Sequence, residues 1–269
     1  MSKKVLVTTG AIIGRPNGRD YKLIEGFRKK LCCDGLEFMM YSTWQEERQQ
    51  IVDYLVSTGI DFPTVHCQKG IGEDIAEGRL STALSRFDGD CMMAEKIGAK
   101  ICVLHLWNGP VSDSHMGRAL AAVPKLISIA REHGVTVTFE NVVCSGESPL
   151  EHLLQIHSLF PEASFTFDTK MAAFHNELQT SFEGDAKELW QGPVKHVHVN
   201  DYDGGYMEWG RLRTLPIGAG RIDFQSVFEN LKNAGYNGDY TIEATAFGSD
   251  GKVDFDMLND SVKKLRNLL

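Results

Sequence analysis

The stretch KHVHVND, residues 195–201, indicates how the rest of the chain is organised. Its apolar and polar residues alternate with a period of two, so it is predicted to form a strand. One face of this strand carries His196, His198 and Asn200, and the other face carries two valines. Two histidines and an amide on one face are unusual for a core strand, so we expect that face to line a functional site.

Three further predicted strands carry a carboxylate at or near their ends. TVTFEN contains Glu140, ASFTFDT contains Asp168 and DYTIEAT contains Glu243. With His198 they supply three carboxylates and one imidazole, a ligand set that suits a divalent cation. Four separate strands can share one ion only if they lie side by side around a common centre, as in a β/α barrel. The sequence therefore predicts one metal ion bound by Glu140, Asp168, His198 and Glu243.

Predicted strands and helices alternate along the whole chain, without a linker, a low-complexity run or a change in composition. The predicted strands cover residues 4–9, 35–41, 62–67, 99–107, 136–141, 163–169, 195–201 and 239–245. This rhythm is typical of a single (β/α)8 TIM barrel of the α/β class, with residues 1–269 as one domain. An open, doubly wound sheet is the alternative, but TTGAIIGRPNG (8–18) lacks the glycine spacing of a dinucleotide-binding turn.

The alternation within the last four strands supports a barrel. If the four ligand-type residues point inward, so do the residues two positions before them, which are small or polar: Thr138, Thr166, His196 and Thr241. The residues between them point outward and are all apolar: Phe139, Phe167, Val197 and Ile242. An apolar outer face is what contact with a shell of helices requires.

Composition excludes some functions. The chain has 269 residues, of which 42% are hydrophobic and 24% charged, and its net charge is −8. This charge disfavours binding to phosphate backbones, and no stretch approaches the roughly 20 apolar residues of a membrane span. We therefore expect a soluble, cytoplasmic protein that binds neither nucleic acid nor membranes; whether it forms a homo-oligomer is left open. The six cysteines contain no C-x-x-C pair and are expected to be reduced and mostly packing residues.

Further side chains could contact a substrate. His66 and His105 fall in inward phase near the ends of the third and fourth strands; each is either a substrate contact or a buried histidine bound to a carbonyl. Trp107 could form an apolar wall or simply pack at the rim. Arg213 could bind a hydroxyl or phosphate through two donors. Asp201 falls in outward phase and is expected to fix a loop.

The sequence resembles the xylose-isomerase-like barrel superfamily, which includes ketose 3-epimerases, hydroxypyruvate isomerases, inosose dehydratases and endonuclease IV. The segments that carry the resemblance are Phe139-Glu140-Asn141, Phe167-Asp168-Thr169, His198 to Asp201, RTLPIGAG (213–220) and Ile242-Glu243. In the ketose epimerases the positions that match the four ligand-type residues bind one divalent metal, often manganese, and the two glutamates exchange the proton. His66 and Arg213 match a family histidine and a family arginine. The resemblance thus implies one bound ion, with Mn2+ favoured and Mg2+, Co2+ or Zn2+ as alternatives.

The chain departs from the family pattern after the sixth strand. The family has D-x-x-H there, with a histidine that contacts the substrate, but this chain has Met171 at that position and His175 four residues later. Either His175 reaches the site from its loop or Met171 lines an apolar subsite. The loss of this histidine, with Thr214 where another is expected, makes the three-metal cluster of endonuclease IV look incomplete.

The leading hypothesis is a metal-dependent isomerase or epimerase that acts on a sugar or sugar phosphate by proton transfer next to a polarised carbonyl, with Glu140 and Glu243 as the catalytic acids and bases. An inosose-type dehydratase is the first alternative; it needs an acid beside the leaving group, for which His66, His105 or Glu147 could serve. A phosphodiesterase like endonuclease IV and a non-catalytic barrel that binds sugar or metal are the remaining alternatives.

Overall fold

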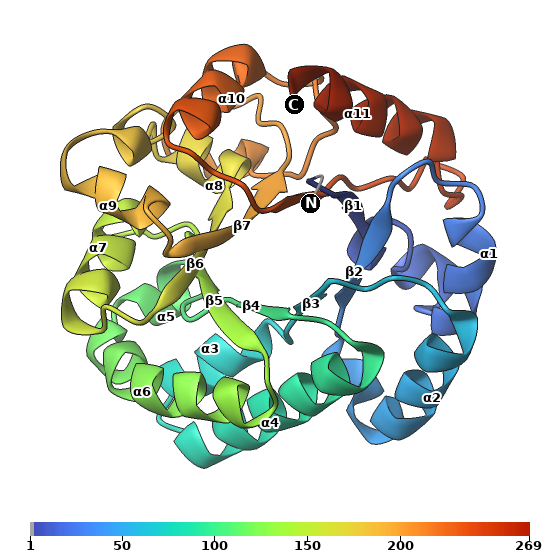
Figure 1. Cartoon of the computed structure of the whole chain (residues 1–269), viewed down its shortest axis with the longest axis horizontal. Helices are drawn as coiled ribbons and strands as arrows, with labels where there is room; N and C mark the ends of the chain where they lie inside the picture. The colour runs from blue at the N-terminus through green and yellow to red at the C-terminus, as the bar shows by residue number, and fades with distance from the viewer. Residues whose placement is uncertain (1–2) are drawn as a thin grey trace.

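The computed structural model describes residues 3–269 and has a closed barrel of eight parallel strands at its centre, in the order β1 to β8 (Figure 1). The strands are β1 Val5–Thr8, β2 Gly35–Met39, β3 Thr64–His66, β4 Ile101–Leu104, β5 Thr136–Glu140, β6 Ser164–Asp168, β7 Val194–Val199 and β8 Asp239–Ile242. The pairing of β8 with β1 closes the ring. The predicted (β/α)8 barrel is confirmed.

Helices surround the barrel as a ring (Figure 1). The α-helices are α1 Ile24–Arg28, α2 Arg48–Thr58, α3 Gly70–Ala76, α4 Leu80–Ile97, α5 Pro110–Asp113, α6 Met116–Glu132, α7 Pro149–Leu159, α8 Thr169–Phe174, α9 Lys187–Trp190, α10 Phe224–Asn233 and α11 Phe255–Leu268. Short 3-10 turns lie at η1 Thr9–Ala11, η2 Arg15–Asn17, η3 Tyr21–Leu23, η4 Ser42–Glu47, η5 Thr180–Phe182, η6 Gly184–Ala186 and η7 Trp209–Arg211. Several connections therefore hold more than the single helix that the sequence pattern predicts.

Local sequence explains where these helices begin and break. Ser148 starts α7 as a capping box, because its hydroxyl accepts from the amide of Glu151 (2.9 Å) and the Glu151 carboxylate accepts from the amide of Ser148 (3.4 Å). The sequence predicts one helix over 182–191, and that prediction is wrong. Gly184 has φ of 50°, outside the right-handed helical region, so Phe182 is separated from the residues that follow it: Phe182 ends η5, whereas η6 leads directly into the four-residue α9.

The predicted inner and outer faces of the last four strands are confirmed. The four outward residues, Phe139, Phe167, Val197 and Ile242, are at most 3% exposed and belong to the hydrophobic core. Inside the barrel, the hydroxyl groups of Thr138 and Thr166 lie 2.7 Å apart, and Nε2 of His196 lies 2.8 Å from Oγ1 of Thr241. The barrel interior is therefore packed with polar groups that hydrogen-bond to one another across strands.

Asp201 holds the loop that follows β7, as expected. Its Oδ2 accepts from the amides of Gly218 (2.9 Å) and Gly220 (2.8 Å), and its Oδ1 accepts from the amide of Ile222 (3.1 Å). A carboxylate with several amide donors is a strong local restraint. The loop that carries residues 211–220 is thereby tied to the end of β7.

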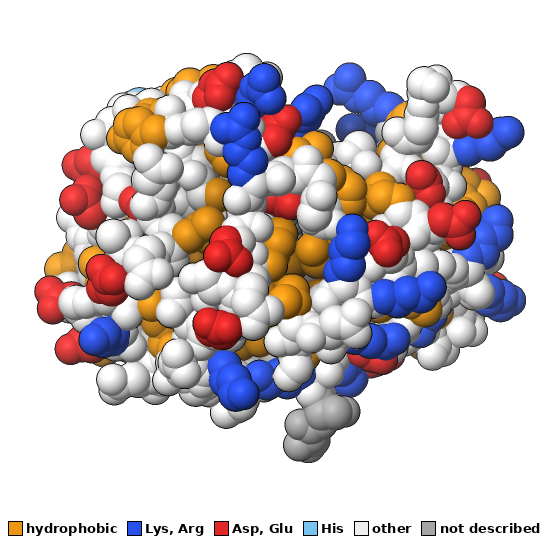
Figure 2. Space-filling model, turned by 90° about the horizontal axis from the view of Figure 1, so that it is seen from above, with side chains coloured by type: hydrophobic (Ala, Val, Ile, Leu, Met, Phe, Trp, Pro, Cys, Tyr) orange, Lys and Arg blue, Asp and Glu red, His pale blue; other side chains and the backbone are white. Residues whose placement is uncertain are grey.

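Surface and cysteine chemistry agree with the composition. No helix within residues 3–269 is long and apolar enough to span a bilayer. Figure 2 shows acidic and basic side chains interspersed on the face in view, without a large area of one sign. All six cysteines are free; five are buried and act as packing residues, whereas Cys32 is exposed.

Glu177, which follows α8, is expected to make stability depend on pH. It is 7% exposed and accepts one hydrogen bond, from the amide of Leu150 (3.3 Å). Burial raises the pKa of Glu177 to about 7, whereas an unfolded glutamate titrates near 4.3. Because the native pKa is the higher one, the stability that Glu177 contributes is complete below about pH 4 and is lost as pH rises through 7.

Glu177→Gln removes this titration. As pH rises from 5 to 8, the free energy of unfolding of the variant should therefore increase relative to that of the native chain by on the order of 2 kcal/mol. Urea unfolding of both proteins at the two pH values measures the change. The exposed Glu229→Gln is the control and should show no such shift. An equal difference between Glu177→Gln and the native chain at both pH values would contradict the assignment.

Candidate active site

Four ligand-type side chains meet at the carboxyl ends of β5 to β8. Glu140 and Asp168 end β5 and β6, His198 lies in β7, and Glu243 follows β8 directly. One oxygen or nitrogen atom from each lies within 4.8 Å of those of the other three. The first three are buried, and the side chain of Glu243 is 13% exposed. The structure therefore brings together all four residues of the predicted metal site and leaves Glu243 the most accessible.

His198 lies at the centre of this group. Its Nδ1 is 2.9 Å from Oε1 of Glu140 and 3.7 Å from Oε1 of Glu243, and its Nε2 is 3.0 Å from Oε2 of Glu37. Burial alone would lower the pKa of His198, but the charges of Glu37, Glu243 and Glu140 outweigh it and hold the pKa well above its usual value. The imidazole is thus surrounded by negative charge on both sides.

Asp168 is held by hydrogen bonds to both of its oxygens. Oδ1 accepts from the amide of Met171 (2.7 Å), where it caps α8, and Oδ2 accepts from Nδ2 of Asn200 (2.8 Å). The same Nδ2 lies 3.4 Å from Oε2 of Glu243. Burial raises the pKa of Asp168 to about 6. Asn200 therefore orients two of the four ligand-type residues, a role that the sequence reasoning did not assign to it.

The group fits a divalent cation. Oε2 of Glu140 is buried and accepts no hydrogen bond of good geometry within residues 3–269, although Nε2 of His105 lies 2.6 Å away, so this oxygen can still ligate an ion. Despite its burial, the pKa of Glu140 lies well below the usual range because of His105 and His198, so the carboxylate is ionised. Three carboxylates and one imidazole suit Mn2+, Mg2+, Co2+ or Zn2+.

A second group forms on the far side of Glu140. Its Oε2 lies 2.6 Å from Nε2 of His105 and 3.6 Å from Nε2 of His66, and these three residues are also close enough to hold an ion. Burial lowers the pKa of His105 to about 4, so its ring is neutral. Nδ1 of His66 lies 2.9 Å from the carbonyl oxygen of Cys67. His66 is therefore a buried histidine bound to a carbonyl, and its Nε2 also lies beside the site.

Two of the other predicted contacts lie in the neighbouring loops. Trp107 is fully buried; its Nε1 donates to the carbonyl oxygen of Val142, and its ring packs edge-on against His152 at 4.9 Å. The side chain of Glu147 is 64% exposed and lies 3.3 Å from Nδ1 of His152. Both residues belong to the region between β4 and α7, outside the four-residue group.

The remaining two predicted contacts also point elsewhere. His175 is buried, and its Nε2 accepts from the amide of Cys144 (3.1 Å). The side chain of Arg213 is 64% exposed, and its Nη2 donates to Oδ2 of Asp203 (2.8 Å). Met171, at the position where the family has its histidine, is 8% exposed and part of the hydrophobic core. Among the described residues, the side chains of His175, Arg213 and Met171 all have partners other than the four ligand-type residues; only the backbone amide of Met171 contacts one of the four, Asp168.

A cleft of about 150 Å³ opens over Glu243. Its lining is Thr8, Gly10, Ala11, Met39, Lys69, Thr214, Glu243, Ala244 and Thr245. Lys69 is exposed, and the hydroxyl of Thr214 accepts from Nζ of the buried Lys170 (3.1 Å). The cleft thus combines small side chains, hydroxyl groups and a cation beside one ligand-type carboxylate, a lining that suits a small polar molecule.

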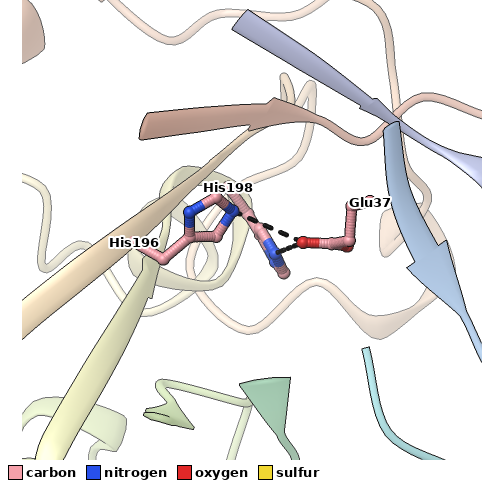
Figure 3. Close-up of side chains that lie close together, drawn as sticks. All are labelled: Glu37, His196 and His198. Atoms are coloured by element: carbon pink, nitrogen blue, oxygen red, sulfur yellow. Dashed lines mark hydrogen bonds and ion pairs between the residues drawn. The ribbon is translucent and has the colours of Figure 1, made fainter. Parts of the chain in front are cut away.

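Glu37 is the residue that sequence reasoning missed. It lies in β2, is 0% exposed, and faces both histidines of β7 (Figure 3). A signal was present: in GLEFMMY (35–41) a single glutamate stands between Leu36 and Phe38, so the alternation that turns those two outward turns Glu37 inward. Glu37 stands in the middle of its strand, whereas the four predicted metal ligands lie at or near strand ends.

Curated proteins resemble this chain over more than half of its length. The chain is similar to L-ribulose 3-epimerase of Methylomonas sp. (strain DH-1), 26% identical over 160 residues that cover 56% of this chain and 50% of that protein. It is also similar to L-ribulose-5-phosphate 3-epimerase UlaE of Escherichia coli O1:K1 / APEC, 22% identical over 209 residues that cover 74% of this chain and 70% of that protein. The chain spans about half the length of the first of these curated relatives.

Solved structures show the same fold. The structure of D-allulose 3-epimerase from Methylomonas sp. superposes with a TM-score of 0.72 at 17% identity and covers 100% of both chains. The sequence model described as xylose isomerase-like TIM barrel matches residues 24–266. The chain therefore belongs to the xylose isomerase-like TIM-barrel family.

Proposed function

We propose that this protein is a metal-dependent epimerase or isomerase of a sugar or sugar phosphate. The observation that carries the proposal is the group formed by Glu140, Asp168, His198 and Glu243, in which two glutamates come from separate strands and one of them faces the cleft. Similarity to a ribulose 3-epimerase and a ribulose-5-phosphate 3-epimerase supports the same reaction type.

The proposed metal ligands are these same four residues. When bound, a divalent ion would polarise the substrate carbonyl and lower the cost of removing the neighbouring proton. The side chains then have distinct tasks. Each oxygen of Asp168 accepts a hydrogen bond from an amide, so Asp168 serves as a rigid ligand. Glu243 borders the cleft and accepts one long hydrogen bond among the described residues, from Nδ2 of Asn200 (3.4 Å). Glu243 is therefore the better placed proton acceptor.

Glu140 is the partner in proton exchange. It lies on β5, three strands from the β8 end that carries Glu243, so the two carboxylates approach a bound sugar from different sides. One can remove a proton and the other can return a proton to the opposite face, which inverts the carbon. The neutral His105, with Nε2 2.6 Å from Oε2 of Glu140, is placed to exchange a proton with this carboxylate.

The test is to incubate the Mn2+-loaded protein in D2O with free ketopentoses and ketohexoses and with their phosphates, followed by NMR. We expect one carbon-bound deuterium in the epimerised sugar, because one carboxylate removes the proton and the other returns a deuteron that it has taken up from D2O. Unsaturated or dehydrated products would indicate a dehydratase instead. Full recovery of every sugar without deuterium would refute the proposal. Comparing each free sugar with its phosphate identifies the substrate class.

A further inference from the structure

Glu37 is a fully buried carboxylate inside the barrel, in contact with one of the ligand-type residues, His198. It lies on β2, while His198 lies on β7, 161 residues away in sequence and three strands away around the ring. Oε2 of Glu37 is 3.0 Å from Nε2 of His198 and 3.2 Å from Oγ1 of Thr241. The contact therefore crosses the barrel interior, and Figure 3 shows both histidines of β7 turned toward this carboxylate.

The hydrogen bonds around Glu37 form one consistent chain. Nε2 of His196 lies 2.8 Å from Oγ1 of Thr241, so the histidine donates to the hydroxyl and the hydroxyl donates to Glu37. His198 then donates to the same oxygen from Nε2. Nδ1 of His198 lies 2.9 Å from Oε1 of Glu140 and donates to that carboxylate when no ion is bound. Because Nε2 is taken by Glu37, Nδ1 is the nitrogen that would give up its proton and bind an ion beside Glu140 and Glu243.

Burial indicates that Glu37 has a purpose beyond packing. The side chain is 0% exposed, and its Oε1 has no hydrogen-bond partner among residues 3–269. A buried carboxylate with an unsatisfied oxygen costs stability that an apolar residue in the barrel interior would not. We propose that Glu37 is a positioning residue: it accepts a hydrogen bond from the N–H at Nε2 of His198, which keeps the proton on Nε2, fixes the angle of the ring, and so presents Nδ1 as a metal ligand. This inference rests on the metal site of the proposed function.

An alternative use of the same atoms is a second ion held by Glu37, His196 and His198, since their ligand atoms are also within 4.8 Å of one another. The hydrogen bonds favour the positioning role. An ion would have to displace the proton between Glu37 and His198 and also the bond from His196 to Thr241. The metal content of the protein separates the two cases.

The experiment measures the dissociation constant for Co2+ by competition with a chromophoric chelator, together with the visible spectrum of the Co2+-loaded protein. Glu37→Gln keeps the shape but removes the charge, and Glu37→Met removes the acceptor. Both should weaken Co2+ binding about 10- to 100-fold and alter the cobalt spectrum, because the ring is no longer oriented. Glu37→Asp keeps the charge and should recover part of the affinity.

Thr64→Val is the matched control. Thr64 pairs with Glu37 in the β2–β3 register, is 1% exposed, and its hydroxyl has no hydrogen-bond partner among the described residues. This variant should bind Co2+ as the native chain does. Circular dichroism and melting of each apo-protein establish that the variants are folded. Adding Glu37→Gln to a His198→Gln background should cause little further loss, because Glu37 acts through His198.

The outcomes are distinct. If the native chain binds no divalent ion, the metal site of the proposed function fails, and this inference fails with it. If the native chain binds one ion and the Gln and Met variants bind it equally well, the positioning role alone is overturned. Two ions in the native chain and one in the Glu37 variants would overturn it in favour of Glu37 as a metal ligand.

Discussion

Replacing Glu243 with glutamine is expected to lower turnover by about 100- to 10,000-fold, the range associated with loss of a general base. The amide keeps an oxygen in the same place but cannot accept a proton. Glu243 borders the cleft and is the least buried of the four ligand-type residues, so it is the carboxylate that a substrate in the cleft would meet first.

Two measurements make this prediction specific. Proton exchange from D2O into the sugar should be lost together with turnover, because both depend on the same base. Metal analysis of Glu243→Gln should still find an ion, since Glu140, Asp168 and His198 remain. Glu229→Gln, on the outer helix α10, serves as the control and should retain full activity. Native rates in Glu243→Gln would show that the base lies elsewhere.

Removing the metal should have an effect of comparable size. Exhaustive chelation is expected to reduce turnover to background, and Mn2+, Co2+ or Mg2+ should restore it, because the carbonyl is no longer polarised without a cation. Stability should fall as well. Without an ion, the oxygens of three carboxylates lie close together in a mostly buried site and repel one another. An ion at 100 times its dissociation constant contributes about 2.7 kcal/mol, so the melting temperature should drop by roughly 5–10 °C.

Thermal melting with and without chelator measures this drop. Asp168→Asn provides the comparison, because it removes one charge from the group, and its single side-chain oxygen can accept from only one of the two amides that hold residue 168. Its gain in melting temperature on adding Mn2+ should be smaller than that of the native chain. If neither chelator nor added metal changes the melting temperature or the activity of the native chain, a metal site at these residues is excluded.

Much of the barrel could be predicted from the sequence because it depends on short-range patterns. Period-two alternation identified the strands, and the phase within each strand identified which residues face inward. The carboxyl ends of parallel strands in a closed barrel lie at the same rim, so Glu140, Asp168, His198 and Glu243 could be expected to meet without knowledge of any contact. The family resemblance pointed to the same residues.

Helix boundaries and loop side chains could not be predicted in this way. The left-handed backbone at Gly184 divides a segment that looks helical by pattern. Arg213 pairs with Asp203, and Trp107 is buried against the loop that precedes α7, because loop side chains are placed by contacts from several elements at once. Sequence spacing carries little information about such contacts.

The sequence by itself determined the fold, the inward face of each strand and the four residues that gather at the rim. Only the tertiary structure decided what lies beneath them: Glu37 bonded to His198 across 161 residues. The physical reason is closure. The sequence pattern of one strand predicts whether a side chain points inward or outward. The residue that this side chain contacts inside the barrel depends on the register of all the strands between the two residues. That register is fixed only when β8 pairs with β1 and the ring closes.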